Sequence, residues 1–287
     1  MLKTVLITGG NRGIGFSAAK LLLLRGGYRV ILGCRSKASG LDAAKELKAE
    51  GVGGVDVVDV VELDVTCSAS VASAAEAVSS LVGETGGLSI LINNAGVLVE
   101  DAGAGSISFA LATNFEGVVR TTLAFEPLLK AGSTVLTTSS SGGTRFMASL
   151  EEEDSAALLS EDLTLEALRY KVKALAEQVA DPSHRLHQLS TPAYNLSKCA
   201  ANCYTQILSR SRPDLFVNAV SPGFSNTGMC ANYSGSRVPK SPELGATVIV
   251  EALEGVGKGK TGLFLKQNSK AGCKVEDAET VVTAWKT

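Results

Sequence analysis

Short apolar runs rich in β-branched residues alternate along this chain with longer segments whose apolar residues recur at helical spacing. The runs predict strands at 4–8, 29–33, 57–63, 88–92, 133–138 and 216–220, and a seventh, edge strand at 262–265. The longer segments predict helices at 16–25, 41–50, 70–82, 109–129 and 194–210, and one that begins at Ser241-Pro242. Near-continuous apolar strands are typical of a sheet buried on both faces. The pattern predicts an α/β fold: a doubly wound parallel sheet of the Rossmann type, with about seven strands.

The stretch between the fifth strand and the helix at 194–210 is about 50 residues long, far more than an ordinary crossover loop. A helical repeat runs through it from Thr164 to Asp181-Pro182, and a shorter acidic helix is expected at 150–159. We interpret residues 145–191 as a helical insertion within a single domain that spans residues 1–287.

Composition narrows the class of protein. The net charge of −2 gives no electrostatic footprint for nucleic acid or an anionic membrane. The apolar runs are too short to span a bilayer, and the first residues enter a strand without a secretory leader. Six scattered cysteines and two histidines lack the spacing of metal ligands. We therefore expect a cytoplasmic protein with no nucleic-acid or membrane partner and no metal.

The first strand leads into a glycine-rich turn, Gly9-Gly10-Asn11-Arg12-Gly13-Ile14-Gly15, which opens the next helix. Glycines let the backbone approach a pyrophosphate, and the helix N-terminus supplies free amides and a positive dipole. A tight strand-to-helix connection is the simpler alternative. The position of the glycine-rich turn directly after the first strand favours a dinucleotide site. The predicted cofactor-binding residues are Gly9, Asn11, Arg12, Gly13, Ile14 and Gly15.

The end of the second strand indicates which dinucleotide is bound. A carboxylate there binds the free ribose hydroxyls of NAD, whereas an arginine accommodates the 2′-phosphate of NADP. The sequence Gly33-Cys34-Arg35-Ser36 has no acid, and Arg12 adds a second cation. We predict NADP(H), with Arg12 and Arg35 at the 2′-phosphate.

Polar and small residues close the next two strands. Asp64-Val65 follows the third strand, where a carboxylate oxygen can accept from the adenine amino group. Asn93-Asn94-Ala95-Gly96 closes the fourth, where small residues admit the cofactor ribose and amides can tie strands together. Carboxyl ends of parallel strands form the ligand crevice in open sheets, so Asp64, Val65, Asn94, Ala95 and Gly96 are predicted to bind the cofactor.

Tyr194 and Lys198 open a predicted helix four residues apart and therefore share a face. A phenol with a pKa of about 10 donates slowly at neutral pH. An ammonium one turn away favours the phenolate and lowers that pKa. The pair predicts a proton donor for the alkoxide that hydride transfer to a carbonyl leaves behind.

Taken together, these motifs resemble the short-chain dehydrogenase/reductase family over residues 3–250. The matching pieces are Thr8 to Gly15, Asp64, Asn93 to Gly96, Asn114, Ser139-Ser140, Tyr194 with Lys198, Pro222-Gly223 and Thr227. The insertion before Tyr194 is similar to that of the monomeric, carbonyl-reductase-like branch.

The resemblance implies roles for further residues. Lys198 also holds the nicotinamide ribose, and Asn114 bends its helix and holds a water that relays protons to Lys198. Ser140 stands at the family spacing from Asn114 and polarises the carbonyl; Ser139 remains the alternative. A monomer is expected, because the insertion covers the helix face through which most of the family pairs.

The resemblance extends to the segment after the sixth strand. Pro222-Gly223 would wall the nicotinamide, and Thr227 would bind its amide or a phosphate. Many relatives carry an acid just after that threonine, where this chain has Gly228. The following loop, residues 224–240, is expected to cover the substrate. Candidate apolar lining residues are Met229, Tyr233 and Trp285.

These expectations lead to one principal hypothesis: an enzyme that reduces a ketone, aldehyde or quinone carbonyl with NADPH. An NADP-dependent dehydrogenase acting on an alcohol, steroid or retinol is the first alternative. A non-catalytic NADP-binding redox sensor is the second, although such a protein usually lacks one of the catalytic residues.

Overall fold

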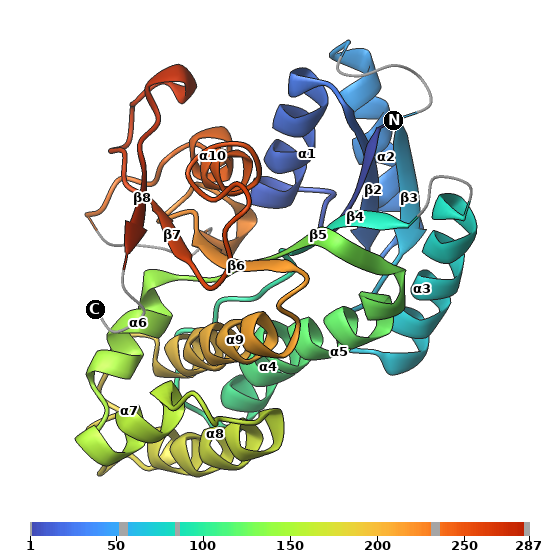
Figure 1. Ribbon diagram of the computed structural model, residues 1–287. Coiled ribbons are helices and arrows are strands. Elements are labelled where there is room, and N and C mark those ends of the chain that lie inside the picture. Colours follow the sequence, from blue (N-terminus) through green and yellow to red (C-terminus); the bar gives the residue numbers. More distant parts are fainter. Residues whose placement is uncertain (1, 52–56, 84–86, 231–235, 284–287) are drawn as a thin grey trace.

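The computed structural model describes residues 2–51, 57–83, 87–230 and 236–283. One eight-stranded sheet runs through these residues (Figure 1). In spatial order its strands are β3 (Val58–Glu62), β2 (Tyr28–Cys34), β1 (Lys3–Thr8), β4 (Leu88–Asn93), β5 (Leu129–Thr138), β6 (Phe216–Ser221), β7 (Phe264–Gln267) and β8 (Thr280–Thr283). All neighbouring pairs are parallel except β7 with β8. The doubly wound parallel sheet predicted from the sequence is confirmed.

The edge of the sheet differs from the prediction. β7 was expected to be the edge strand, but β8 pairs with it in antiparallel register and is the edge. β8 has only four residues, and their burial does not alternate. Its pairing depends on β7, 13 residues away at the nearest, and not on a local pattern of its own.

The α-helices are α1 (Gly13–Arg25), α2 (Lys37–Ala49), α3 (Ser68–Val82), α4 (Ala104–Asn114), α5 (Glu116–Phe125), α6 (Ser141–Ala148), α7 (Glu152–Leu159), α8 (Leu165–Ala180), α9 (Pro192–Ser211) and α10 (Pro242–Leu253). Three 3₁₀ turns are η1 (Glu126–Leu128), η2 (Gly228–Cys230) and η3 (Val275–Asp277). None of these described helices is both long and apolar enough to cross a membrane.

Two apolar cores lie on opposite faces of the sheet. Val5 and Ile7 of β1 pack with residues of α1, α2 and α10, whereas Leu6 packs with α3, α4, α5 and α9 (Figure 1). Side chains alternate along a strand, so one apolar strand serves both cores. This double burial explains why the central strands read as continuous apolar runs.

The prediction of one long helix at 109–129 is wrong. The chain instead forms α4 and α5, with a break at Phe115. Asn114, the last residue of α4, exchanges two hydrogen bonds with the backbone of Val97. Pro127 then stops the helical run, and Leu129 already pairs with β4. The break depends on a contact 17 residues away, so the helical periodicity does not reveal it.

The expected helical repeat before α9 forms α8. The side chains of Leu168, Val172, Leu175 and Val179 are buried. They belong to the same core as α4 and α9, and α8 lies along α9 on the side away from the sheet (Figure 1). An ion pair of 2.7 Å from Arg169 to Glu116 fastens α8 to α5.

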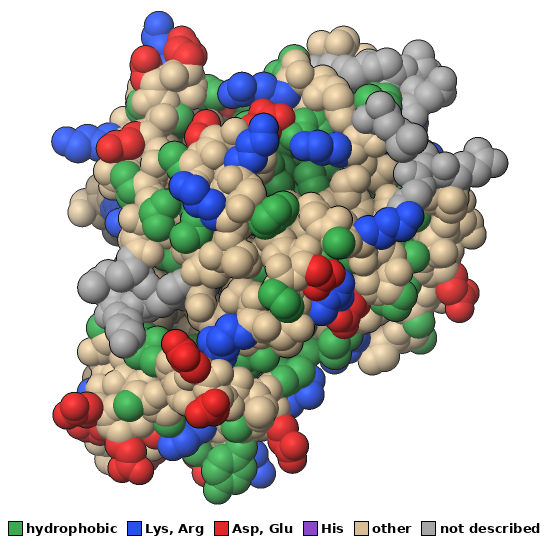
Figure 2. Space-filling view, viewed as in Figure 1, with side chains coloured by type: hydrophobic (Ala, Val, Ile, Leu, Met, Phe, Trp, Pro, Cys, Tyr) green, Lys and Arg blue, Asp and Glu red, His purple; other side chains and the backbone are tan. Residues whose placement is uncertain are grey.

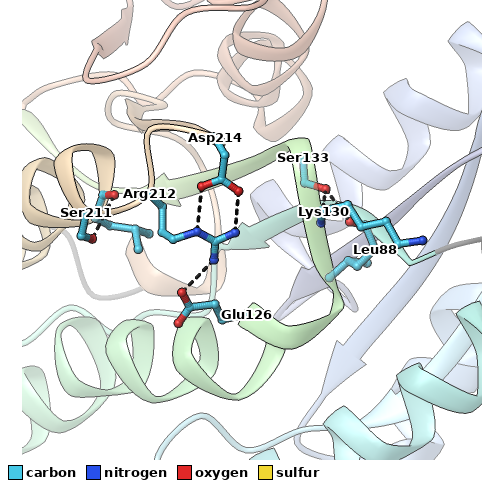
Figure 3. A network of polar contacts seen from close by, with 8 residues as sticks. Leu88, Glu126, Lys130, Ser133, Ser211, Arg212 and Asp214 are labelled. Atoms are coloured by element: carbon cyan, nitrogen blue, oxygen red, sulfur yellow. Dashed lines mark hydrogen bonds and ion pairs between the residues drawn. The ribbon is translucent and has the colours of Figure 1, made fainter.

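A polar network lies at the end of the sheet opposite to the glycine turn (Figure 3). Arg212, which follows α9, donates to both carboxylate oxygens of Asp214 at 2.8 Å and to Glu126 at 2.7 Å. The backbone oxygen of Asp214 accepts from Gly132 at 2.8 Å. Nearby, the Ser133 hydroxyl donates to the Leu88 carbonyl at 2.9 Å. These bonds join α9, η1 and the start of β5.

Candidate active site

A cavity of about 1130 Å³ opens at the carboxyl ends of the parallel strands. Most of the residues predicted from the sequence line it together: Gly9, Asn11, Arg12, Gly13, Ile14, Arg35, Asp64, Val65, Asn94, Ala95, Gly96, Ser140, Tyr194, Lys198, Pro222, Gly223 and Thr227. Two predicted residues, Gly15 and Asn114, lie behind this wall. The fold therefore brings glycine turn, strand ends and the tyrosine–lysine pair to one place.

The glycine turn is tight enough to require its glycines. Gly9 and Gly13 have positive φ angles of 65° and 56°. A Cβ on Gly15 would lie 2.4 Å from the Gly9 oxygen and 2.6 Å from the Asn94 amide nitrogen. The N-cap residue of α1, Arg12, makes no side-chain capping bond. The first amides of the helix are therefore left for a ligand.

Asn94 ties β4 to β1 beside this turn. Its side-chain amide donates to the Thr8 carbonyl at 3.0 Å. The backbone amides of Asn94 and Ala95 both donate to the Thr8 hydroxyl at 2.9 Å. The two central strand ends are thus fixed where a dinucleotide would cross them.

Arg12 and Arg35 are both exposed at the cavity rim. Within the described part of the chain, neither guanidinium has a hydrogen-bond or ion-pair partner. Asp64 lies nearby and accepts from the Thr66 amide at 2.9 Å and from its hydroxyl at 2.7 Å. Partial burial opposes ionisation of Asp64, but these bonds and the charge of Arg35 lower its pKa on balance. An ionised Asp64 is an acceptor for an adenine amino group.

Tyr194 and Ser140 both line the cavity and are partly buried. Burial raises the pKa of Tyr194, whereas a hydrogen bond with Ser140 and the charge of Arg145 act in the opposite direction. The pKa is raised on balance, so the phenol is protonated at neutral pH. Protonated, it is a donor to a reacting oxygen.

Lys198 is buried beneath Tyr194. Its ammonium donates to the Thr138 carbonyl at 2.8 Å and lies 5.8 Å from the centre of the Tyr194 ring. Burial lowers the pKa of Lys198 to about 8. The ammonium therefore stays charged at neutral pH and is within electrostatic range of the phenol.

The two candidate serines have different surroundings. The Ser139 hydroxyl is buried and donates to Asn202 on α9. The Ser140 hydroxyl caps α6 by accepting from the Gly142 amide at 3.0 Å, and it also reaches Tyr194. Only Ser140 directs its hydroxyl toward the phenol, and this geometry favours it over Ser139.

Asn114 is fully buried and does not line the cavity. Its side chain is committed to the backbone of Val97 and to the Ser197 hydroxyl, at 2.8–2.9 Å. Gly96 lies between it and the site: a Cβ there would be 3.1 Å from Asn114 Oδ1 and 3.4 Å from Lys198 Nζ. The absence of a side chain at Gly96 keeps the two groups close.

Sequence reasoning did not single out two cavity residues, Arg145 and Lys240, although Lys240 is the last residue of the predicted substrate loop. The Lys240 ammonium donates to the backbone and side-chain oxygens of Gln267. It lies close to Gly223, where a Cβ would be 2.8 Å from the Lys240 nitrogen. Burial, and then the charges of Arg237 and Lys266, lower its pKa to about 8. Within the sequence, Lys240 merely preceded a Ser-Pro helix start, and Arg145 fell inside the expected insertion.

Described residues on both sides of 231–235 in the predicted substrate loop line the cavity, with Met229 among them. Tyr233 and Trp285 lie outside the described residues. Within the described ranges, no group of three or more His, Cys, Asp or Glu side chains is placed to hold a metal ion.

A doubly wound sheet whose crevice joins a glycine turn to a tyrosine–lysine pair defines a class, the dinucleotide-dependent oxidoreductases. Residues 3–151 match the family model described as short chain dehydrogenase. A short-chain dehydrogenase/reductase, ATR10 of Stachybotrys chlorohalonatus, is 33% identical over 91% of this chain and 86% of its own length. The chain belongs to the short-chain dehydrogenase/reductase family.

Two further likenesses extend over nearly the whole chain. Carbonyl reductase [NADPH] 1 of Sus scrofa is 28% identical over 92% of this chain and 91% of its own. The solved structure of salutaridine reductase from Papaver somniferum superposes with a TM-score of 0.77 at 26% identity, covering 94% of this chain and 100% of that one.

Proposed function

We propose that this protein reduces a ketone, aldehyde or quinone carbonyl to the alcohol, with NADPH as the reductant. The chain is an NADP-dependent oxidoreductase by its family and its similarity to an NADPH carbonyl reductase. One observation carries the finer proposal: a single cavity holds the Ser140–Tyr194 pair, the buried Lys198 ammonium and the exposed Arg12 and Arg35.

The residues along the cavity wall supply groups suited to each part of an NADP molecule. The glycine turn and the free amides of α1 bind the pyrophosphate, and Arg12 and Arg35 bind the 2′-phosphate. Asp64 and Val65 hold the adenine, and Asn94, Ala95, Gly96 and Lys198 hold the ribose beside the nicotinamide. Pro222, Gly223 and Thr227 form the wall at the nicotinamide. When bound, NADPH supplies the hydride.

The side chains of the protein stabilise and protonate the carbonyl oxygen of the substrate. The Ser140 hydroxyl donates to the carbonyl oxygen and stabilises the charge that develops on it. The Tyr194 phenol gives its proton to the alkoxide, and the Lys198 ammonium stabilises the phenolate that remains. Asn114 positions Lys198 indirectly, by holding the Val97 backbone and the Ser197 hydroxyl.

A turnover assay tests this function. The purified protein is mixed with NADPH or NADH and a panel of quinones, diketones, aliphatic ketones and aldehydes, and the loss of nicotinamide absorbance is followed. We expect NADPH-selective reduction of several carbonyls. NADPH binding without turnover of any of them would contradict the proposal and favour a redox sensor.

A variant pair tests the mechanism. Tyr194→Phe removes the only proposed proton donor, so kcat should fall by at least about 100-fold. Tyr170→Phe is the matched control, because Tyr170 is 76% exposed on α8. Retention of near-full turnover by Tyr194→Phe would exclude the proton-transfer role.

A further inference from the structure

The cavity wall is strongly positive beyond the residues assigned to NADPH. Five cationic side chains line that part: Arg145, Arg237, Lys240, Lys266 and Lys270. Among the described lining residues the single acid is Asp64, which belongs to the adenine end. On the face shown in Figure 2, by contrast, cationic and acidic side chains are interspersed. The whole chain has 27 Lys and Arg against 29 Asp and Glu, so the excess of cations is a local property of the cavity.

Three of these cations lie close enough to repel one another. The charges of Arg237 and Lys266 add to the effect of burial in lowering the pKa of Lys240. Lys240 is 7% exposed, and its hydrogen-bond acceptors are two neutral oxygens of Gln267. A buried cation without a counter-charge is unfavourable. A bound anion would relieve this repulsion.

Among these five cations, Arg145 is the one whose charge acts on Tyr194. It lies in the second turn of α6, whose N-cap is Ser140. Its side chain is exposed at the cavity. Within the described ranges it has neither a hydrogen-bond nor an ion-pair partner. A free guanidinium binds a carboxylate through two parallel hydrogen bonds.

The cavity is also lined by exposed apolar side chains. Phe109, Met229 and Val238 line it and are 48%, 42% and 70% exposed. Exposed apolar side chains gathered at a concave site are typical of a ligand-binding wall. A ligand for this region needs an apolar body and a negative charge.

We infer that the substrate is an apolar ketone or aldehyde that carries a carboxylate, and that Arg145 binds this carboxylate. Lys240 and Lys266 add positive potential on the wall beside Gly223. The inference rests on the proposed reductase function and specifies its substrate class. The phosphates of NADPH do not account for these cations, because the proposed phosphate-binding groups are the glycine turn, Arg12 and Arg35.

Two probes with one skeleton test the inference: 4-oxo-4-phenylbutyrate and its methyl ester. We expect the wild-type enzyme to prefer the acid. Arg145→Met should lower kcat/KM for the acid by about 10- to 100-fold, mainly through KM, and leave the ester within about two-fold. Arg145→Lys should recover part of the loss. Arg25→Met, an exposed arginine away from the cavity, should change neither substrate.

Three outcomes would overturn the inference. One is a wild-type enzyme that reduces the ester as well as the acid. Another is an equal loss for both probes in Arg145→Met. The third is a loss that appears in the KM for NADPH, which would assign Arg145 to the cofactor.

A binding measurement separates this inference from the proposed function. Calorimetric titration of 4-oxo-4-phenylbutyrate into the enzyme–NADP⁺ complex requires no turnover. Binding that is lost in Arg145→Met supports the carboxylate site even if no carbonyl is reduced, and only the reductase function then fails. Active reduction of neutral ketones without any binding of the acid overturns the carboxylate site alone.

Discussion

The Lys198 ammonium lies 5.8 Å from the centre of the Tyr194 ring and donates a hydrogen bond to the Thr138 carbonyl at 2.8 Å. The helical spacing of four residues puts both groups on one face of α9. The end of β5 supplies the carbonyl that holds the ammonium in place. Lys198 thus lies beside the phenol ring while it is anchored to the sheet.

The pKa of Lys198 leads to a prediction about pH. Burial lowers that pKa to about 8, so the ammonium is present below pH 8 and is lost as the pH rises through this value. We expect kcat/KM for NADPH, which reports groups of the free enzyme, to be flat at lower pH. Above about pH 8 it should fall up to ten-fold per pH unit.

Lys240 also has a pKa lowered to about 8, so it needs a control. The pH profile of Lys240→Met should keep the decline if Lys198 is the titrating group. Loss of the decline in that variant would assign the titration to Lys240, and a wild-type profile that stays flat to pH 10 would exclude both.

Cofactor selectivity should depend on Arg35 at the end of β2. Arg35→Met removes an exposed guanidinium that has no hydrogen-bond or ion-pair partner within the described ranges, so the fold should be unaffected. We expect the KM for NADPH to rise by about 10- to 100-fold and the KM for NADH to stay nearly constant. Steady-state kinetics with both cofactors measure this, with Lys45→Met on α2 as a surface control. A parallel rise for NADH would contradict a 2′-phosphate contact.

The two neighbouring serines should differ in their contribution to catalysis. Ser140→Ala should lower kcat by about 100- to 1,000-fold, because it removes the donor to the carbonyl oxygen, and loss of the α6 N-cap should lower the free energy of unfolding by about 1 kcal/mol. Ser139→Ala leaves the buried Asn202 oxygen without its donor and should lower the free energy of unfolding by about 1–3 kcal/mol. Its kcat should stay within a few-fold of wild type. Urea denaturation and kcat are measured for both variants. A large loss of kcat in Ser139→Ala, with kcat retained in Ser140→Ala, would assign the contact with the carbonyl to Ser139.

Arg212 should stabilise the protein without affecting activity (Figure 3). It is about one-quarter exposed and holds both Glu126 and Asp214. Arg212→Met should lower the free energy of unfolding by about 1–2 kcal/mol, since partly exposed pairs contribute little singly. The control Lys45→Met breaks a pair whose side chains are 79% and 76% exposed, and it should have no measurable effect. Equal urea midpoints for the two variants would show that the Arg212 network contributes nothing.

The chain should be a monomer in solution. α8 buries Leu168, Val172, Leu175 and Val179 along α9 and α4, so this helix face is already covered within one chain. Light scattering should give the mass of one chain, 29.6 kDa, at all accessible concentrations. A two-fold particle would mean that another surface pairs, or that α8 moves aside.

The alternation of strands β1 to β7 with helices, the glycine turn and the shared helix face of Tyr194 and Lys198 could be predicted from the sequence. Each depends on local chemistry: alternation between buried runs and helical repeats, the positive φ of Gly9 and Gly13, and four-residue spacing on a helix. Arg12 and Arg35 could be proposed for the same reason, since strand and turn place them by position alone.

Only the tertiary structure decided the features that depend on distant contacts. The break after Asn114 requires the Val97 backbone, and the β8 edge requires β7 as its partner. Ser139 and Ser140 are adjacent and chemically identical, and only the approach of α9 turns one toward Asn202 and the other toward Tyr194. Arg145 and Lys240 are 95 residues apart, so their shared cavity wall exists only once the sheet and its crossovers have formed.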